Sequence, residues 1–267
     1  MSDVLIIMCG GAAGNAILGP AADENFDESV KDARQKFGED LDIVTKGEST
    51  LDINDQKALE DRLSQYRIVT TYCVLGGEFG TDLVQEIIKT SRAVGCKIVS
   101  IFGIPMEMEA DRRKRALKAL PESVALTDCS LVIDMQRSQE LNLEFGDREW
   151  KNFLRLSDTM VVSSVVSVRD CLQGPFFSTF KSKLYAFVSH SDVMPVKAVM
   201  KAWDSILFDD SQALDDSVVM VGKNIKSSEI EDIKNQVVMN HGSMPEVVAR
   251  SDSDDSKVIV FRAVKSF

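Results

Sequence analysis

Two short glycine-rich segments carry the residue types best suited to binding an anion. They read CGGAAGNA at residues 9–16 and LGGEFGTD at residues 75–82. Each follows a short apolar run and precedes an amphipathic pattern, so each is expected between a strand and a helix. A helix N-terminus has free N–H groups, and glycines let a phosphate approach the backbone closely. Both turns therefore favour phosphate binding, with a plain tight turn as the alternative for each.

Neither turn matches a standard nucleotide motif. No Gly-Lys-Ser/Thr follows, and the spacing is not Gly-x-Gly-x-x-Gly, which excludes a Walker A loop and disfavours a Rossmann-type metabolic enzyme. The second turn also contains Glu78 and Asp82. One like-charge contact at about 4 Å costs roughly 4 kcal/mol in a partly exposed site. These acids therefore weaken triphosphate binding unless a cation or an outward rotamer relieves them.

Composition narrows the class of partner. The chain of 267 residues has 31 basic and 42 acidic residues, a net charge of −11, which argues against nucleic acid or an anionic membrane as the main partner. No apolar run approaches the ~20 residues of a membrane span, and the N-terminus resembles a first strand rather than a signal peptide. Two distant histidines and scattered cysteines do not form a metal motif. The cysteines are expected to be buried free thiols of a cytoplasmic protein: Cys9, Cys73, Cys96, Cys129 and Cys171.

The elements that must position these turns alternate along the first half of the chain. Apolar runs of strand length alternate with helical patterns, which predicts an α/β fold with a parallel sheet and right-handed crossovers. The expected strands are Val4–Cys9, Leu41–Thr45, Arg67–Leu75, Lys97–Ile104 and Ser130–Met135. The expected helices are Asn15–Gln35, Asp55–Gln65, Asp82–Val94 and Asp111–Leu120.

The remainder is expected to form a central helix and a smaller α/β domain. The segment TMVVSSVVSV has strand-like residue types, but its valines repeat at helical spacing, so residues 149–172 are interpreted as one long helix. This divides the chain into a nucleotide-binding domain at 1–148, a linking helix at 149–172 and a shortened C-terminal domain at 173–267. The polar run at 251–256 is interpreted as a hairpin loop. The C-terminal elements are Leu184–Ser189, helix Met194–Ser205, Val218–Gly222, helix Ser227–Asn240, Val247–Arg250 and Lys257–Val264.

Taken together and in this order, the turns resemble those of the FtsZ/tubulin superfamily. The first is similar to the superfamily's opening nucleotide loop, in which glycines precede Asn-Ala, and the second to its GGGTGTG signature. The resemblance implies a fold with a Rossmann-like GTP-binding domain, a long central helix and a smaller C-terminal domain. The matching residues, which would form the phosphate cradle, are Gly10, Gly11, Gly14, Asn15, Gly76, Gly77, Gly80 and Thr81.

The resemblance continues downstream. The segment IPMEMEADRRKR is similar to the FtsZ pattern Pro-Phe-x-Phe-Glu-Gly-x-x-Arg, and implies that Glu109 and Arg113 hold ribose or phosphate. The start of the central helix keeps an aromatic-to-acid spacing in Phe153 and Asp158. A carboxylate can accept hydrogen bonds from the ring N–H and amine of guanine, and an aromatic ring can lie against the base. The alternative is a core phenylalanine and a surface acid.

The catalytic loop departs from the family pattern. FtsZ hydrolyses GTP between subunits through an Asn-x-Asp-x-x-Asp loop, to which HSDVMPVKAVM corresponds. His190 replaces the asparagine, Asp192 is retained, and Pro195 replaces the second acid. Loss of a group that positions water typically costs ~10²–10⁴ in rate. Asp192, acting in trans, is therefore the only catalytic remnant.

The resemblance implies a protein that binds GTP or GDP, with Mg²⁺ as a candidate counter-ion, and hydrolyses GTP slowly or not at all. It also implies self-association as a dimer or filament, or association with other FtsZ-like proteins, without nucleic-acid or direct membrane binding. The alternative is a pseudo-GTPase that binds no nucleotide and acts as a structural or regulatory dimerising module. The acids in the second turn favour this alternative.

Overall fold

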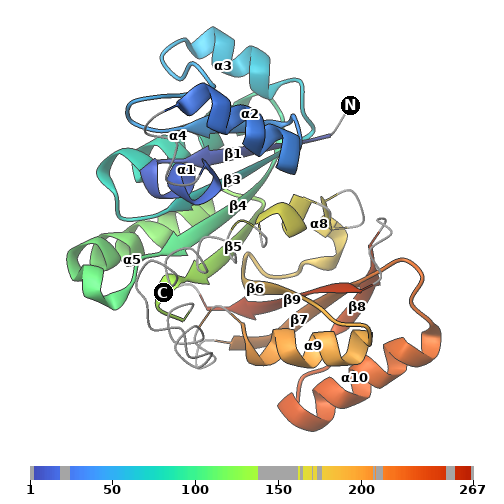
Figure 1. The fold of residues 1–267 in the computed structure, drawn as a ribbon. Helices are drawn as coiled ribbons and strands as arrows, with labels where there is room; N and C mark the ends of the chain where they lie inside the picture. Colours follow the sequence, from blue (N-terminus) through green and yellow to red (C-terminus); the bar gives the residue numbers. More distant parts are fainter. Residues whose placement is uncertain are drawn as a thin grey trace.

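The computed structural model describes residues 3–18, 25–137, 162, 165–169, 171–172, 176–206, 208, 213–250 and 256–265. These residues form one nine-stranded, mostly parallel sheet in the order β2-β1-β3-β4-β5-β6-β9-β7-β8, with helices packed against it (Figure 1). The expected α/β fold class is therefore confirmed. No helix in the described residues is long and apolar enough to span a bilayer.

The N-terminal half is a five-stranded parallel sheet whose strands are almost entirely buried. Burial on both faces explains the continuous apolar runs in the sequence. Helix α1 packs against α2, and α3 packs against α4. The strands are β1 (Val4–Cys9), β2 (Leu41–Val44), β3 (Ile68–Val74), β4 (Lys97–Ile104) and β5 (Cys129–Asp134), and the helices are α1 (Gly11–Leu18), α2 (Phe26–Phe37), α3 (Gln56–Leu63), α4 (Glu78–Ala93), the 3₁₀ turn η2 (Glu107–Glu109) and α5 (Ala110–Ala125).

The C-terminal half continues the same sheet, because β6 pairs in parallel with β5. Strand β9 is antiparallel to both β6 and β7, and β8 is parallel to β7, so this part of the sheet is mixed. Helices α9 and α10 pack on each other at one end of the molecule (Figure 1). The bounds are α8 (Phe176–Thr179), β6 (Leu184–Ser191), α9 (Pro195–Asp204), β7 (Ala213–Val221), α10 (Ser227–His241), β8 (Glu246–Ala249) and β9 (Lys257–Val264).

Three expectations about local structure were wrong. The first long helix is two separate helices, and α2 starts where the Asn25 side chain accepts a hydrogen bond from the Glu28 N–H. Helix α4 begins at Glu78 rather than Asp82, so five of the eight residues of the second glycine segment are helical. The run at 251–256 does not join a hairpin, because β7 lies between β8 and β9 in the sheet.

The predicted central helix lies largely outside the described residues. Within 149–172, positions 162, 165–169 and 171–172 are described, and all are helical. Val162, Val165 and Val168 are buried, so packing rather than β-propensity decides the local structure here. The sheet crosses the expected domain boundary without a break, and the three-part division of the chain remains a prediction.

The edge strand β2 is held by a buried carboxylate. Asp42 is 2% exposed and accepts hydrogen bonds from Arg34 at 3.0 Å and Arg62 at 2.9 Å. Thr50 adds a third hydrogen bond at 3.1 Å from the loop that follows the strand. A buried charge is tolerated when it is paired and hydrogen-bonded. This cluster therefore joins α2, α3 and the loop after β2.

Candidate functional site: a basic cleft between two glycine turns

The strand order places both glycine turns at the same edge of the sheet. Strands β1 and β3 are parallel neighbours, with Cys9 opposite Cys73. From β1 the chain first moves outward to β2 and then returns past β1 to β3, so the strand order reverses at this point. In open α/β sheets, ligands bind outside the carboxyl ends of the strands at such a reversal. The first segment follows β1 and the second follows β3, so both lie at that position.

Two glycines bring the turns into direct contact. Gly10 has φ +88°, and a Cβ built on it would lie 3.1 Å from the Cα of Gly80. A Cβ on Gly80 would in turn lie 3.4 Å from the Cα of Gly10. A larger residue at Gly10 would be strained in its backbone and would press against the backbone of Gly80, whereas a Cβ on Gly80 would just reach van der Waals contact with Gly10. The two sequence motifs therefore form one structural unit.

A third glycine fits the second turn against helix α5. Gly76 has φ +84°, and a Cβ on it would lie 2.0 Å from the carbonyl oxygen of Arg112. The Gly76 N–H donates to the Thr81 hydroxyl at 2.9 Å, and the Arg115 Nε donates to the Gly76 carbonyl at 2.9 Å. Thr81 thus closes the turn from within α4.

The remaining glycines differ in their surroundings. A Cβ added to Gly11 or to Gly77 would meet no atom within 4 Å, and both residues border a cleft of about 470 Å³. Gly14 instead packs under the loop after β2, where a Cβ would lie 2.8 Å from the Thr45 Cγ2. Asn15 is exposed on α1. The cleft is lined by Cys9, Gly10, Gly11, Ala12, Lys46, Val74, Gly77, Glu78, Phe79, Gly80, Arg112 and Arg115.

The charges that line this cleft oppose the charge of the whole chain. Lys46, Arg112 and Arg115 contribute three positive charges and Glu78 contributes one negative charge, whereas the protein carries a net charge of −11. Glu78 and Asp82 are both exposed, and Asp82 does not line the cleft. Because Asp82 lies outside the cleft and Glu78 is exposed to solvent, the repulsion is smaller than the sequence predicts. An anion is therefore the ligand that this cleft favours.

Two buried thiols lie at the ends of β1 and β3, where the glycine turns begin, and one of them, Cys9, lines the cleft. The Cys73 Sγ donates to the Gly80 carbonyl oxygen at 3.2 Å and so fixes the first turn of α4. Burial raises the pKa of Cys73 to about 12, against the opposing effect of the nearby Arg112 charge. Burial also raises the pKa of the Cys9 thiol, and the nearby Cys73 adds to this rise. Both thiols therefore stay neutral beneath the glycine turns at ordinary pH.

Glu109 and Arg113, which the sequence resemblance assigned to ribose or phosphate, each bind another protein group. Arg113 donates two hydrogen bonds of 2.7 Å to the Asp134 carboxylate at the end of β5, and another of 2.7 Å to the Pro105 carbonyl. Glu109 pairs with Arg112 at 2.7 Å. Neither Glu109 nor Arg113 lines the glycine cleft among the described residues. Their contact with ribose or phosphate stays a prediction.

The other predicted site residues lie elsewhere. Phe153 and Asp158 fall outside the described residues. Asp192 follows β6, accepts a hydrogen bond from the Met194 N–H at 3.1 Å and pairs with Lys201 at 2.9 Å. Hydrogen bonding to Lys201, followed by that to the Met194 backbone, lowers the pKa of Asp192. Asp192 is absent from the residues described around the glycine cleft, so a catalytic role would have to be exerted in trans.

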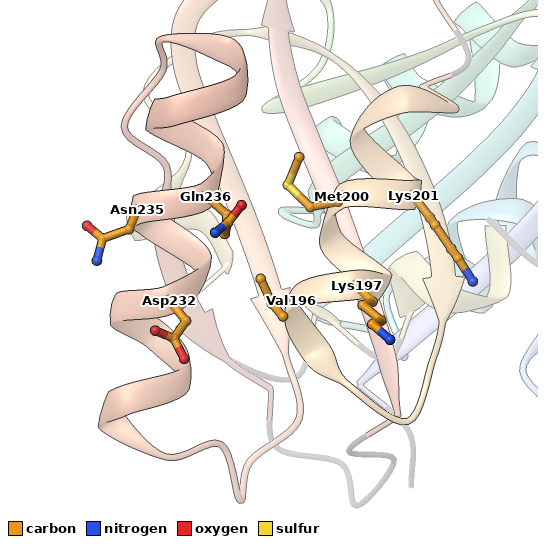
Figure 2. Close-up of a pocket in the computed structure, with 7 residues that line it drawn as sticks. All are labelled: Val196, Lys197, Met200, Lys201, Asp232, Asn235 and Gln236. Atoms are coloured by element: carbon orange, nitrogen blue, oxygen red, sulfur yellow. The ribbon is translucent and has the colours of Figure 1, made fainter.

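A second hollow lies between α9 and α10 in the C-terminal half. It has a volume of about 650 Å³ and is lined by two lysines and one aspartate together with apolar and amide side chains. Figure 2 shows Val196 and Met200 of α9 between the two helices, while Lys201 points away from α10. No group of three His, Cys, Asp or Glu side chains with metal-ligand geometry occurs in the described ranges. The Mg²⁺ expectation remains a prediction.

Sequence reasoning missed the three basic residues of the cleft. Arg112 and Arg115 are three positions apart, which places both on one face of a helix. The sequence could have revealed this shared face, but not that the face turns toward Gly76. Lys46 lies in the loop after β2, and only the tertiary fold brings that loop beside the glycine turns.

Comparison with known proteins supports the assignment of the fold. No protein-family model matches the chain. Over 167 residues it is 25% identical to a cell division protein FtsZ of Mycoplasmopsis pulmonis, covering 62% of this chain and 34% of that protein. The chain therefore spans about a third of the length of this curated relative.

Two solved structures share the fold over nearly the whole chain. The empty FtsZ dimer of M. jannaschii matches with a TM-score of 0.65 and 16% identity, covering 100% of this chain and 89% of that chain. GDP-form protofilaments of TubZ from Bacillus thuringiensis serovar israelensis match with a TM-score of 0.60 and 11% identity, covering 98% of this chain and 85% of that chain. The chain therefore has the fold shared by these FtsZ and TubZ structures.

Proposed function

We propose that this chain, which has the FtsZ/tubulin fold and is a divergent representative of that superfamily, binds a guanine nucleotide. The ligand is GTP or GDP, and its phosphates lie in the cleft between the two glycine turns. The observation that carries the proposal is the contact between Gly10 and Gly80, which joins two separate motifs around one basic cleft.

The cleft suits phosphates by shape as well as charge. Two free faces, at Gly11 and Gly77, allow phosphate oxygens to approach the backbone N–H groups closely. Helices α1 and α4 both begin at this edge, so their N-terminal dipoles point toward the same ligand. We assign the phosphate cradle to Gly10, Gly11, Gly14, Asn15, Gly76, Gly77, Gly80 and Thr81, with Gly14 and Thr81 supporting the turns.

Hydrolysis is proposed to be slow or absent. Pro195 is the first residue of α9 and cannot polarise water, and the Asp192 carboxylate is already bound by Lys201. A remaining activity would depend on Asp192 of one subunit reaching the phosphates of the next. Replacing Asp192 with asparagine should then abolish residual GTP hydrolysis and leave nucleotide affinity unchanged, as measured by phosphate release and equilibrium titration.

Self-association is proposed from the structural neighbours. One is described as an FtsZ dimer and another as TubZ protofilaments. We propose that this chain assembles as a dimer or filament, alone or with other FtsZ-like proteins, in the cytoplasm and without binding nucleic acid or membrane directly. Sedimentation velocity with and without GTP tests whether association depends on the nucleotide.

A second candidate function is a pseudo-GTPase that binds no nucleotide and acts as a dimerising regulatory module. The observation that favours it is the engagement of expected ligand residues with protein partners. Arg113 is bound by Asp134, and Glu109 is bound by Arg112. If those pairs persist in solution, neither side chain is available for ribose or phosphate.

The deciding experiment is to purify the protein gently, denature it and identify any released nucleotide by chromatography. Guanine nucleotide near one per chain supports the proposed function. If the protein is empty, folded and unchanged in melting temperature by GTP and GDP, the regulatory module is the better account.

The assignment of the base pocket has its own test. Asp158 is proposed to recognise the ring N–H and amine of guanine, with Phe153 against the base. Loss of a hydrogen bond to a charged group costs about 1.5–3 kcal/mol, so Asp158→Ala should lower GDP affinity roughly 10- to 100-fold. Unchanged affinity in a protein that binds GDP would refute the assignment.

A further inference from the structure

We infer that Lys46, Arg112 and Arg115 form a built-in cationic clamp that binds the phosphate chain of the ligand without requiring a divalent metal ion. This inference rests on the proposed function, because it concerns the same cleft, and it identifies the chemistry by which the cleft holds its ligand. The three residues come from two elements, the loop after β2 and helix α5, and they line the cleft together with the glycines.

Two of the three cations have charge left for a ligand. In the described part of the chain, neither Lys46 nor Arg115 forms an ion pair with a carboxylate. Arg115 uses its Nε to hold the Gly76 carbonyl at 2.9 Å, and this orients the guanidinium beside the turn. Its two terminal nitrogens can then donate to phosphate oxygens, in the bidentate way that arginine favours.

Arg112 completes the clamp from the adjacent turn of α5. Its Nη1 donates to Glu109 at 2.7 Å, and its side chain is 30% exposed. Arg112 and Arg115 both line the cleft, and they lie three positions apart on one face of α5.

Lys46 extends the positive charge to a neighbouring hollow. Lys46 and Phe79 line both the glycine cleft and a second cleft of about 580 Å³ bordered by the loop after β2. Lys46 therefore lies where the two clefts meet, and a phosphate chain that starts at the glycine turns and extends toward the second cleft would pass it. At this place an ammonium group neutralises charge that a divalent ion would otherwise neutralise.

The neighbouring charges disfavour an additional metal ion. Three cations surround the cleft, and the carboxylate that lines it is Glu78, which is exposed. Like charges at close range repel in a partly exposed site, so a divalent ion would compete with the side chains for the same phosphate oxygens. Affinity should consequently depend little on Mg²⁺ and fall steeply with salt.

The test is isothermal titration of the full chain with GTP and, separately, with inorganic tripolyphosphate, each in EDTA and in Mg²⁺. The variants are Lys46→Gln and Arg115→Gln. The matched control is Lys114→Gln, an exposed lysine of the same helix that does not line the cleft. Thermal melting of each variant confirms that it is folded, and Lys46→Gln is the safer variant because Lys46 is exposed on a loop.

The expected result is binding of both probes in EDTA, with less than about a threefold change on adding Mg²⁺. Lys46→Gln and Arg115→Gln should each weaken both probes roughly 10- to 100-fold, which is the usual loss for a charge-assisted hydrogen bond. Lys114→Gln should bind as the wild type does.

Three outcomes separate this inference from the proposed function. Binding only with Mg²⁺, or Lys46→Gln behaving as Lys114→Gln, overturns the clamp and leaves guanine-nucleotide binding standing. Binding of tripolyphosphate without binding of GTP supports the clamp and overturns the proposed function. Binding of neither probe under any condition overturns both.

Discussion

Gly76→Ala is the substitution that tests the architecture of the site most sharply. The new Cβ would lie 2.0 Å from the Arg112 carbonyl oxygen, and the residue would need φ +84°. Left-handed backbone costs a non-glycine residue about 1–2 kcal/mol, and overpacking adds about 1–3 kcal/mol. Together these predict a loss of roughly 2–5 kcal/mol in the free energy of unfolding, because the chain must separate the turn from α5.

Substitutions at two other glycines separate the cost of backbone strain from the cost of overpacking. Gly95 has φ +89° but no atom within 4 Å of a built Cβ, so Gly95→Ala should cost the backbone strain alone, about 1–2 kcal/mol. Gly77 has φ −81° and equally open space. Gly77→Ala should therefore change stability by less than about 1 kcal/mol, since the poorer helix cap is offset by reduced chain entropy.

Thermal unfolding followed by circular dichroism measures the series. For a chain of this size each kcal/mol shifts the melting temperature by about 2–4 °C. The expected order of melting temperatures is wild type close to Gly77→Ala, then Gly95→Ala, then Gly76→Ala. If Gly76→Ala has the same melting temperature as Gly95→Ala, then the turn does not pack against α5 as described, and the cleft is not supported by that helix.

Two further predictions concern the stability of the fold, one at the edge strand β2 and one beneath the glycine turns. Asp42→Asn should lower the free energy of unfolding by roughly 2–4 kcal/mol, as measured by urea titration. This is less than the roughly 3–5 kcal/mol of a fully buried pair, because Arg34 and Arg62 remain 29% and 27% exposed. The control Asp61→Asn, at an exposed position of α3, should cost below about 0.5 kcal/mol, and equal losses in the two variants would refute a special role for Asp42. Burial raises the pKa of Cys73 from its ordinary 9.0 to about 12. The contribution of this buried thiol to stability is therefore complete below the pKa of the thiol in the unfolded chain, and it is lost as pH rises through the pKa of the thiol in the folded chain. Melting temperature should thus fall between about pH 9 and pH 12, less steeply in Cys73→Ala, and identical alkaline profiles would contradict the burial of this thiol.

The sheet could be predicted because its strands are apolar on both faces. The expected strands at Val4–Cys9 and Lys97–Ile104 coincide with β1 and β4, and burial of both faces leaves few other arrangements for such runs. The order reversal between β1 and β3 follows from topology, which local pattern does not encode. The expected hairpin at 251–256 failed for that reason, because β9 inserts between β6 and β7.

The candidate site was only partly accessible from sequence. The glycines could be matched, since the need for positive φ at Gly10 and Gly76 restricts the residue type. The directions of the arginine side chains on α5 could not be predicted from the sequence, because they depend on how α5 is rotated about its axis. Arg113 resembles a ligand residue in the sequence, yet it is bound to Asp134, whereas Arg112 and Arg115 border the cleft.

Hydrogen exchange with and without millimolar GTP tests the central claim most directly, because it reports both binding and its location. The account predicts slower amide exchange in residues 10–14 and 76–81, which form the two glycine turns. Exchange that is unaltered at both turns, in a protein that remains folded, would contradict the assignment of this cleft as the nucleotide site.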